Sequence, residues 1–219
     1  TKFVQLRREI FGDGFKLAHA TKIAHPEGAI ESGFINNPDE LVSILKRLAE
    51  RFGTRFVRAT LPEEKAYLFT TSINRVPPEG LEDAVAFIIE ENAPVSLAES
   101  VFDFEIVSED ESAGEIKLSV SVLPKNVVNA YAELFESALI TPVSFDLESR
   151  AIARVVIGRG DRRPHLIINL SLNKTGFYVV EKEVVQFSIT PAYGLGEDNS
   201  YSNLDDLKPK PSQEQIEAQ

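Results

Sequence analysis

Apolar residues recur at helical spacing in an early segment of the chain. They form one face of a helix, which comprises Leu41, Ile44, Leu45, Leu48 and Phe52. Asn37 stands where a helix N-cap is favoured, and Pro38 suits the first helical position. Gly53 suits the residue at which a helix stops. The pattern therefore predicts an amphipathic helix over residues 38–52.

Other segments alternate between apolar and polar residues, which is typical of half-buried strands. Such strands are predicted at 3–10, 15–24, 56–61, 67–73, 101–108, 116–123, 143–147, 166–170, 177–180 and 184–189. The first two are joined by Gly12, Asp13 and Gly14, which favour a hairpin turn. The last two are predicted to form a second hairpin.

Three further helices are predicted: one that starts at Leu81 and ends before Pro94, one over 127–135 and one over 148–157. Pro77 and Pro78 mark a break before the first of them. Residues 81–147 then read as helix, strand, strand, helix, strand, which indicates a compact α+β unit with two helices on one face of a three-stranded sheet. Its predicted core comprises Val85, Ile88, Val128, Tyr131 and Phe135 packed on Phe102, Phe104, Leu118 and Val120. The whole chain is expected to have an α/β fold.

Composition narrows the classes of function. The 219 residues carry a net charge of −11, which repels phosphate backbones and anionic lipids, so no nucleic-acid partner is expected. The chain has no cysteine, which excludes disulfides and thiol chemistry. No apolar run approaches the ~20 residues that span a bilayer, so direct membrane insertion is not expected. We expect a soluble cytoplasmic protein, and the missing initial Met raises the question of whether the chain is a fragment.

Candidate chemistry is sparse. The three histidines, His19, His25 and His165, are far apart, and no catalytic triad or carboxylate pair emerges, so no catalytic or metal-binding residue is predicted. One polar turn follows the apolar strand at 166–170, and it contains Asn169, Ser171, Asn173, Lys174 and Thr175. Such residues favour ordinary turns, which is the preferred interpretation, but a nucleotide loop remains the alternative.

Four short stretches carry a resemblance when they are taken in order. Residues 84–104 (AVAFIIEENAPVSLAESVFDF) form an apolar helix with an acidic end, a proline turn, a Leu-x-Glu step and a strand with alternating aromatics. The others are 28–35 (GAIESGFI), Leu61-Pro62 and 143–154 (VSFDLESRAIAR). Together they resemble the PilM family, the actin-like proteins of type IV pilus machines. The division protein FtsA and the secretion protein GspL have related folds and rank behind it.

The resemblance implies an actin-like ATPase fold with two lobes, in which the α+β unit is inserted into the first lobe. It implies a first-lobe core at 1–75, the inserted α+β subdomain at 76–147, and a helix with the start of a partial second lobe at 148–200. Residues 201–219 have few apolar anchors and are expected to form a flexible tail.

Actin-like folds hold ATP and Mg²⁺ between two phosphate loops, so these cofactors are expected here only through the resemblance. The first loop would precede Phe3, where this chain has no residues for it. The second would be the turn at 169–175, where Asn169 stands in the place of an Asp and Ser171 in the place of a Gly. Lys174 could partly replace the metal as a phosphate partner. We therefore expect weak or no ATP binding and negligible hydrolysis.

The resemblance also implies a groove between the first lobe and its insert that holds the cytoplasmic tail of the inner-membrane protein PilN. The residues expected near it are Leu61, Pro62, Asn92, Pro94 and Leu97. Ordinary packing between subdomains is an equal alternative. The implied role is a cytoplasmic scaffold that is recruited to the inner membrane, with pilus motor ATPases and self-association as further contacts. An actin-like ATPase completed by segments missing here, and an FtsA-like division protein, are the competing functions.

Overall fold

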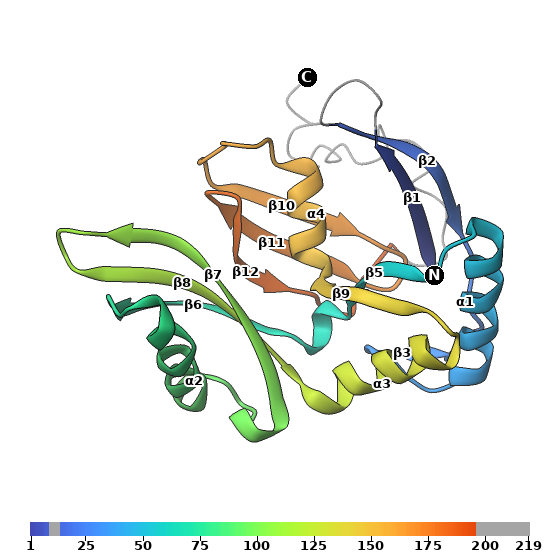
Figure 1. Cartoon of the computed structure of the whole chain (residues 1–219), viewed down its shortest axis with the longest axis horizontal. Coiled ribbons are helices and arrows are strands. Elements are labelled where there is room, and N and C mark those ends of the chain that lie inside the picture. The colour runs from blue at the N-terminus through green and yellow to red at the C-terminus, as the bar shows by residue number, and fades with distance from the viewer. Residues whose placement is uncertain (9–13, 196–219) are drawn as a thin grey trace, which may run out of the picture.

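The computed structural model describes residues 1–8 and 14–195 (Figure 1). The elements before the middle of the chain are β1 (Lys2–Arg8), β2 (Phe15–Lys22), β3 (Ile30–Glu31), β4 (Phe34–Ile35), α1 (Pro38–Phe52), β5 (Phe56–Leu61), η1 (Glu63–Lys65), β6 (Tyr67–Asn74), η2 (Pro78–Gly80), α2 (Leu81–Asn92) and η3 (Leu97–Glu99). The others are β7 (Ser100–Asp110), β8 (Glu115–Pro124), α3 (Lys125–Ser137), β9 (Thr141–Leu147), α4 (Glu148–Val156), β10 (His165–Leu170), β11 (Thr175–Glu181) and β12 (Val184–Ile189). The predicted turn residues Gly12 and Asp13 and the predicted tail lie outside the described residues.

Helix α1 has the bounds that its apolar face predicts. Four residues of that face are buried, namely Leu41, Ile44, Leu45 and Leu48. Gly53 adopts the left-handed conformation, with φ of 61°, and ends the helix. Asn37 is the N-cap, but its side chain forms no capping hydrogen bond. The acidic Asp39 and Glu40 in the first turn instead complement the helix dipole.

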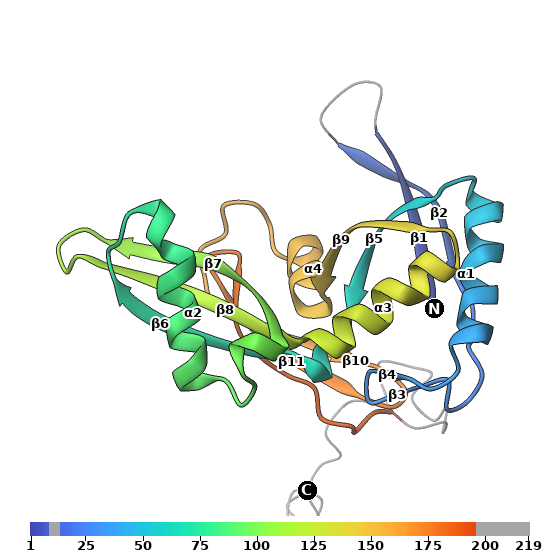
Figure 2. The same ribbon diagram turned by 60° about the horizontal axis from the view of Figure 1, so that its bottom comes forward.

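The strands pair in small sheets whose arrangement differs from the predicted α+β unit. Strand β8 is the centre of the antiparallel sheet β6-β8-β7, and β9 pairs in parallel with β5 (Figure 2). The expectation that residues 81–147 form one sheet of their own is therefore wrong, because β6 joins from the predicted first-lobe core and β9 leaves for it. Alternation along a strand determines which residues face the core, but it does not determine which strand lies beside it.

Helix α2 covers one face of the β6-β8-β7 sheet at one end of the molecule (Figures 1 and 2). Val85 and Ile89 on the helix are fully buried against a cluster that includes Leu118 and Val120 on the sheet. Ile88, Phe102 and Phe104 are partly buried at the same cluster. This half of the predicted core is confirmed.

The other helix of the predicted unit, α3, packs elsewhere. Phe135 is buried in a cluster with Leu41 and Leu45 of α1. Val128 and Tyr131 pack against a different cluster, which contains Tyr178 and the rest of the β10-β11-β12 core. The prediction that all three residues pack on the sheet under α2 is wrong, because Phe135 packs with residues of α1, and Val128 and Tyr131 pack at the cluster that contains Tyr178.

Candidate functional site

The loop after β5 is held against a hairpin that sequence patterns did not predict. Strands β3 and β4 pair around Ser32 and Gly33, which both have positive φ, at 46° and 80°. A two-residue turn with positive φ at both positions is a tight hairpin turn, and the Ser-Gly pair was its signal. A Cβ on Gly33 would lie 2.8 Å from Cβ of Pro62. The hairpin therefore packs directly on the segment Pro62–Lys65, which we call the Pro62 loop.

Glu63 points from the Pro62 loop to the start of helix α4. It is a buried carboxylate, 3% exposed. Its Oε2 accepts a hydrogen bond from the backbone N–H of Ser149 at 3.0 Å, and its Oε1 accepts one from the Ser149 hydroxyl at 2.7 Å. The N–H groups of a first helical turn have no partner within the helix, and the N-terminus favours negative charge. A remote carboxylate thus caps α4.

The neighbouring Glu64 pairs with Lys174 in the turn between β10 and β11. Lys174 Nζ lies 3.0 Å from Glu64 Oε2 and 3.2 Å from Glu148 Oε2. Asn169 Nδ2 donates to Glu148 Oε1 at 3.4 Å. Burial lowers the Lys174 pKa, but Glu148 and Glu64 outweigh it, and the pKa is raised above its ordinary value. The lysine is therefore a charged bridge between two carboxylates.

The remaining residues of the predicted phosphate loop close the turn on itself. The backbone N–H of Ser171 donates to the carbonyl of Lys174, and the Thr175 hydroxyl donates to the carbonyl of Tyr193 at 2.6 Å. Asn173 is exposed. Lys174 already lies against two carboxylates, those of Glu64 and Glu148. This local excess of negative charge opposes the entry of a phosphate, which favours the interpretation of 169–175 as an ordinary turn.

The predicted groove residues fall into two groups. Leu61 and Pro62 lie at the end of β5, and Leu61 is only 6% exposed, so it could shape a groove only from beneath. Asn92 ends α2, with its side chain donating to the carbonyl of Ile88, and Pro94 is exposed. Leu97 is partly buried at the cluster that contains Val85 and Leu118, which we call the α2 cluster.

A row of side chains connects the two groups, and sequence reasoning missed it. Tyr67 begins β6, directly after the Pro62 loop, and lies opposite Val122, which in turn lies opposite Phe102. Phe69 and Ile73, two and six positions further along β6, pack at the α2 cluster, so Tyr67 is on the same face of the sheet. Tyr67 is nevertheless 41% exposed. An aromatic side chain here, between the Pro62 loop and the cluster that contains Leu97, was not identifiable from local patterns.

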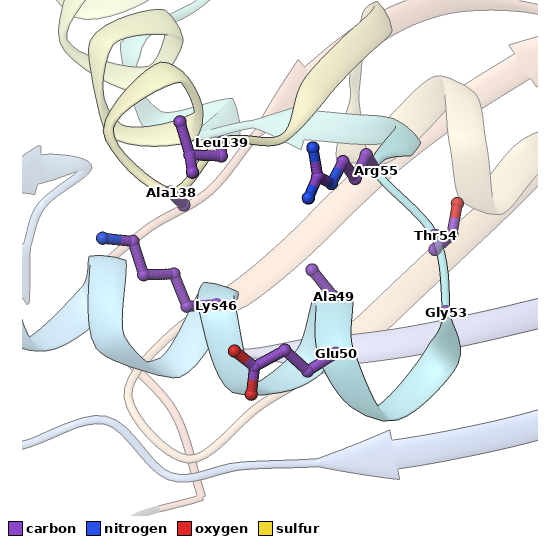
Figure 3. A pocket seen from close by; sticks show the side chains of 8 residues that line it. All are labelled: Lys46, Ala49, Glu50, Gly53, Thr54, Arg55, Ala138 and Leu139. Atoms are coloured by element: carbon purple, nitrogen blue, oxygen red, sulfur yellow. The ribbon is translucent and has the colours of Figure 1, made fainter.

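Two cavities lie elsewhere. One of about 340 Å³ lies between the C-terminal ends of α1 and α3 (Figure 3) and is lined by Lys46, Ala49, Glu50, Gly53, Thr54, Arg55, Ala138 and Leu139. Another of about 490 Å³ is lined by Ala24, His25, Pro26, Glu40, Ser43, Ile44 and Arg47. Neither contains a residue of the predicted sites.

Acidic and histidine side chains within 1–8 and 14–195 form no cluster suited to a metal ion. His165 pairs with Asp161, which also binds Arg163. In the same part of the chain, no helix is long and apolar enough to cross a membrane.

Comparisons with solved structures show the fold. A chain of a PilM-PilN type IV pilus biogenesis complex superposes with a TM-score of 0.75 at 18% sequence identity, over 95% of this chain and 63% of that one. This chain thus corresponds to less than two thirds of that protein's length. The cytoplasmic domain of EpsL, an inner-membrane component of the Vibrio cholerae type II secretion system, superposes with a TM-score of 0.53 at 10% identity, over 88% and 71% of the two chains.

These likenesses show the actin-like α/β fold that the resemblance implied. A comparison with curated protein sequences gives no match. The sequence profile described as type IV pilus assembly protein PilM, however, matches residues 1–197. That match covers nearly all of the described chain, and the chain therefore belongs to the PilM family of type IV pilus assembly proteins.

Proposed function

We propose that this protein is a cytoplasmic scaffold of a type IV pilus machine that binds the cytoplasmic tail of an inner-membrane, PilN-like protein. The family match and the likeness to a chain of a PilM-PilN complex support this role. A scaffold of this kind would be recruited to the inner membrane through that partner. Pilus motor ATPases are the further contacts that the role implies, and self-association would extend the scaffold.

The observation that carries the proposal is the exposed side chain of Tyr67, which lies between the Pro62 loop and the cluster that contains Leu97. Tyr67 presents an apolar ring with a polar tip, a combination that is common at the centre of binding surfaces. Phe34, whose ring lies under Lys65 of the Pro62 loop, is a second exposed aromatic side chain in this region of the chain, at 48% exposure. An extended apolar peptide is the occupant that such a surface favours.

The test is titration calorimetry with peptides from the cytoplasmic tail of the PilN-like protein encoded in the same genome. Wild type is expected to bind, and Tyr67→Asp is expected to bind at least tenfold more weakly, because the introduced carboxylate would lose its water on contact. Leu166→Asp is the matched control, since Leu166 is an apolar residue of β10 that is 62% exposed. Absence of binding by wild type, or equal loss in both variants, would contradict the proposal.

A further inference from the structure

The Pro62 loop is attached to two parts of the molecule at once. On one side Pro62 packs on Gly33, and Lys65 Nζ lies 3.7 Å from the centre of the Phe34 ring, so the loop contacts the β3–β4 hairpin. On the other side its two carboxylates reach α4 and the β10–β11 turn, through Glu63 to Ser149 and through Glu64 to Lys174. We call these last two contacts the carboxylate latch.

The Glu64 contact of the latch depends on one cation. Lys174 is the positive charge that both Glu64 and Glu148 contact, at 3.0 and 3.2 Å. Neutralising it would leave two carboxylates facing each other across the space that the ammonium group fills, with the buried Glu63 next to Glu64. Like charges at such separations repel strongly where water is partly excluded. Glu64 lies in the single 3-10 turn η1, whereas Glu148 lies in the first turn of the longer helix α4, so Glu64 is the group expected to move away.

We infer that Lys174 determines the position of the Pro62 loop and thereby regulates partner binding at the surface around Tyr67. The inference rests on the proposed function, because it concerns the same surface. It gives the β10–β11 turn a role that needs no bound nucleotide. Any interaction that draws Lys174 away from Glu64 would loosen the Pro62 loop, which borders the surface around Tyr67.

The coupling must be reciprocal, because it is a free energy that two sites share. A peptide that binds the ordered Pro62 loop would also stabilise the contact between Glu64 and Lys174. Hydrogen exchange offers suitable probes. The backbone N–H groups of Lys65 and Ala66 donate within the loop, to Pro62 and Glu63, and that of Ser149 donates to Glu63.

The first experiment measures hydrogen exchange in the free protein, with Lys174→Met as the variant. Methionine keeps much of the side-chain length and removes the charge. Exchange at Lys65, Ala66 and Ser149 is expected to become at least fivefold faster. Lys46→Met is the matched control, since Lys46 is an exposed lysine on α1, and it should leave these amides unchanged. Unchanged exchange in Lys174→Met would overturn the inference whatever the peptide result.

The second experiment measures peptide affinity in the same variants. Lys174→Met is expected to weaken binding about five- to tenfold. The double variant Lys174→Met with Glu64→Gln should recover part of the lost affinity, because it removes one of the two repelling charges. The effects of the two substitutions on affinity would then not add, which a double-mutant cycle detects. Affinity equal to wild type in Lys174→Met would overturn the inference. A wild-type protein that binds no tail peptide would instead contradict the proposed function, and loop exchange would then decide the inference alone.

Discussion

The Glu63 carboxylate accepts hydrogen bonds from both the backbone N–H and the hydroxyl of Ser149, although the two residues are 86 positions apart in the chain. Both side chains are buried. The contact joins the loop after β5 to the first turn of α4, so a local helix cap is made by a long-range tertiary contact. It also makes Glu63 the natural target for the first test of the fold.

Glu63→Ala is expected to lower the free energy of unfolding by about 3 kcal/mol, because it leaves a buried N–H and a buried hydroxyl without their acceptor. Glu63→Gln keeps one acceptor oxygen and should cost about half as much. Urea denaturation measures both. Glu79→Ala, at an exposed glutamate of η2, is the control and should stay within about 0.5 kcal/mol of wild type. Equal stability of the Ala and control variants would contradict the capping role.

A comparison of Gly33→Ala with Gly114→Ala separates the cost of backbone strain from the cost of a clash with the Pro62 loop. Gly33 and Gly114 both have positive φ, at 80° and 67°, so alanine at either is expected to cost about 1 kcal/mol. Only at Gly33 would the added Cβ meet Pro62, whereas nothing lies within 4 Å at Gly114. Gly33→Ala is therefore expected to cost at least about 2 kcal/mol more in thermal or urea unfolding. Matching costs in the two variants would show that the hairpin and the Pro62 loop are not in close contact.

Arg150 makes an asymmetric set of ion pairs between α4 and β7. Its side chain is 8% exposed, while its partners Asp103 and Glu105 are 74% and 44% exposed. Arg150→Met leaves two carboxylates that water can solvate, so a cost of about 1 kcal/mol is expected. The double variant Asp103→Ala with Glu105→Ala leaves a buried cation alone and should cost about 3 kcal/mol. If Arg150→Met proved the more damaging, burial of the uncompensated charge would not be the dominant effect.

Stability is expected to fall at alkaline pH through Tyr131. Burial, with Glu64 nearby, raises the pKa of Tyr131 to about 12. Between about pH 10 and 12 the folded protein therefore keeps the Tyr131 proton, whereas the unfolded chain, in which the tyrosine pKa is near 10, has lost it. The resulting stability is present below pH 10 and is lost between about pH 10 and 12. Tyr131→Phe should show a shallower loss in this window, although it also removes the hydrogen bond to the carbonyl of Gly33. Parallel stability profiles for the two proteins would contradict the raised pKa.

Mg-ATP is expected to leave the melting temperature of this chain unchanged. Lys174, the one cation of the candidate phosphate loop, already contacts Glu64 and Glu148, and a phosphate would approach both carboxylates. A ligand at 100 times its Kd stabilises a protein by about 2.7 kcal/mol, which a thermal-shift measurement detects easily. An upward shift that disappears in Lys174→Met would return the ATPase hypothesis to first place.

The local elements follow from the sequence by itself. The apolar face of α1, the left-handed Gly53 and the alternation along β7 and β8 are short-range patterns, because helix and strand periodicity act over a few residues. The same kind of pattern contributed to the family resemblance, since much of 84–104 and 143–154 lies in such elements. Prediction was less good for β3 and β4, two-residue strands whose only signal was a Ser-Gly turn.

Tertiary structure decided what those elements do together. Parallel pairing of β9 with β5, and the packing of Phe135 against α1, depend on partners far along the chain that an alternating pattern does not name. The same holds for the site. Lys174 was recognisable as a cation in a polar turn, but its contacts with Glu64 and Glu148 arise only when the loop, the helix and the turn meet. Charge interactions depend on distance in space, and the folded backbone sets that distance.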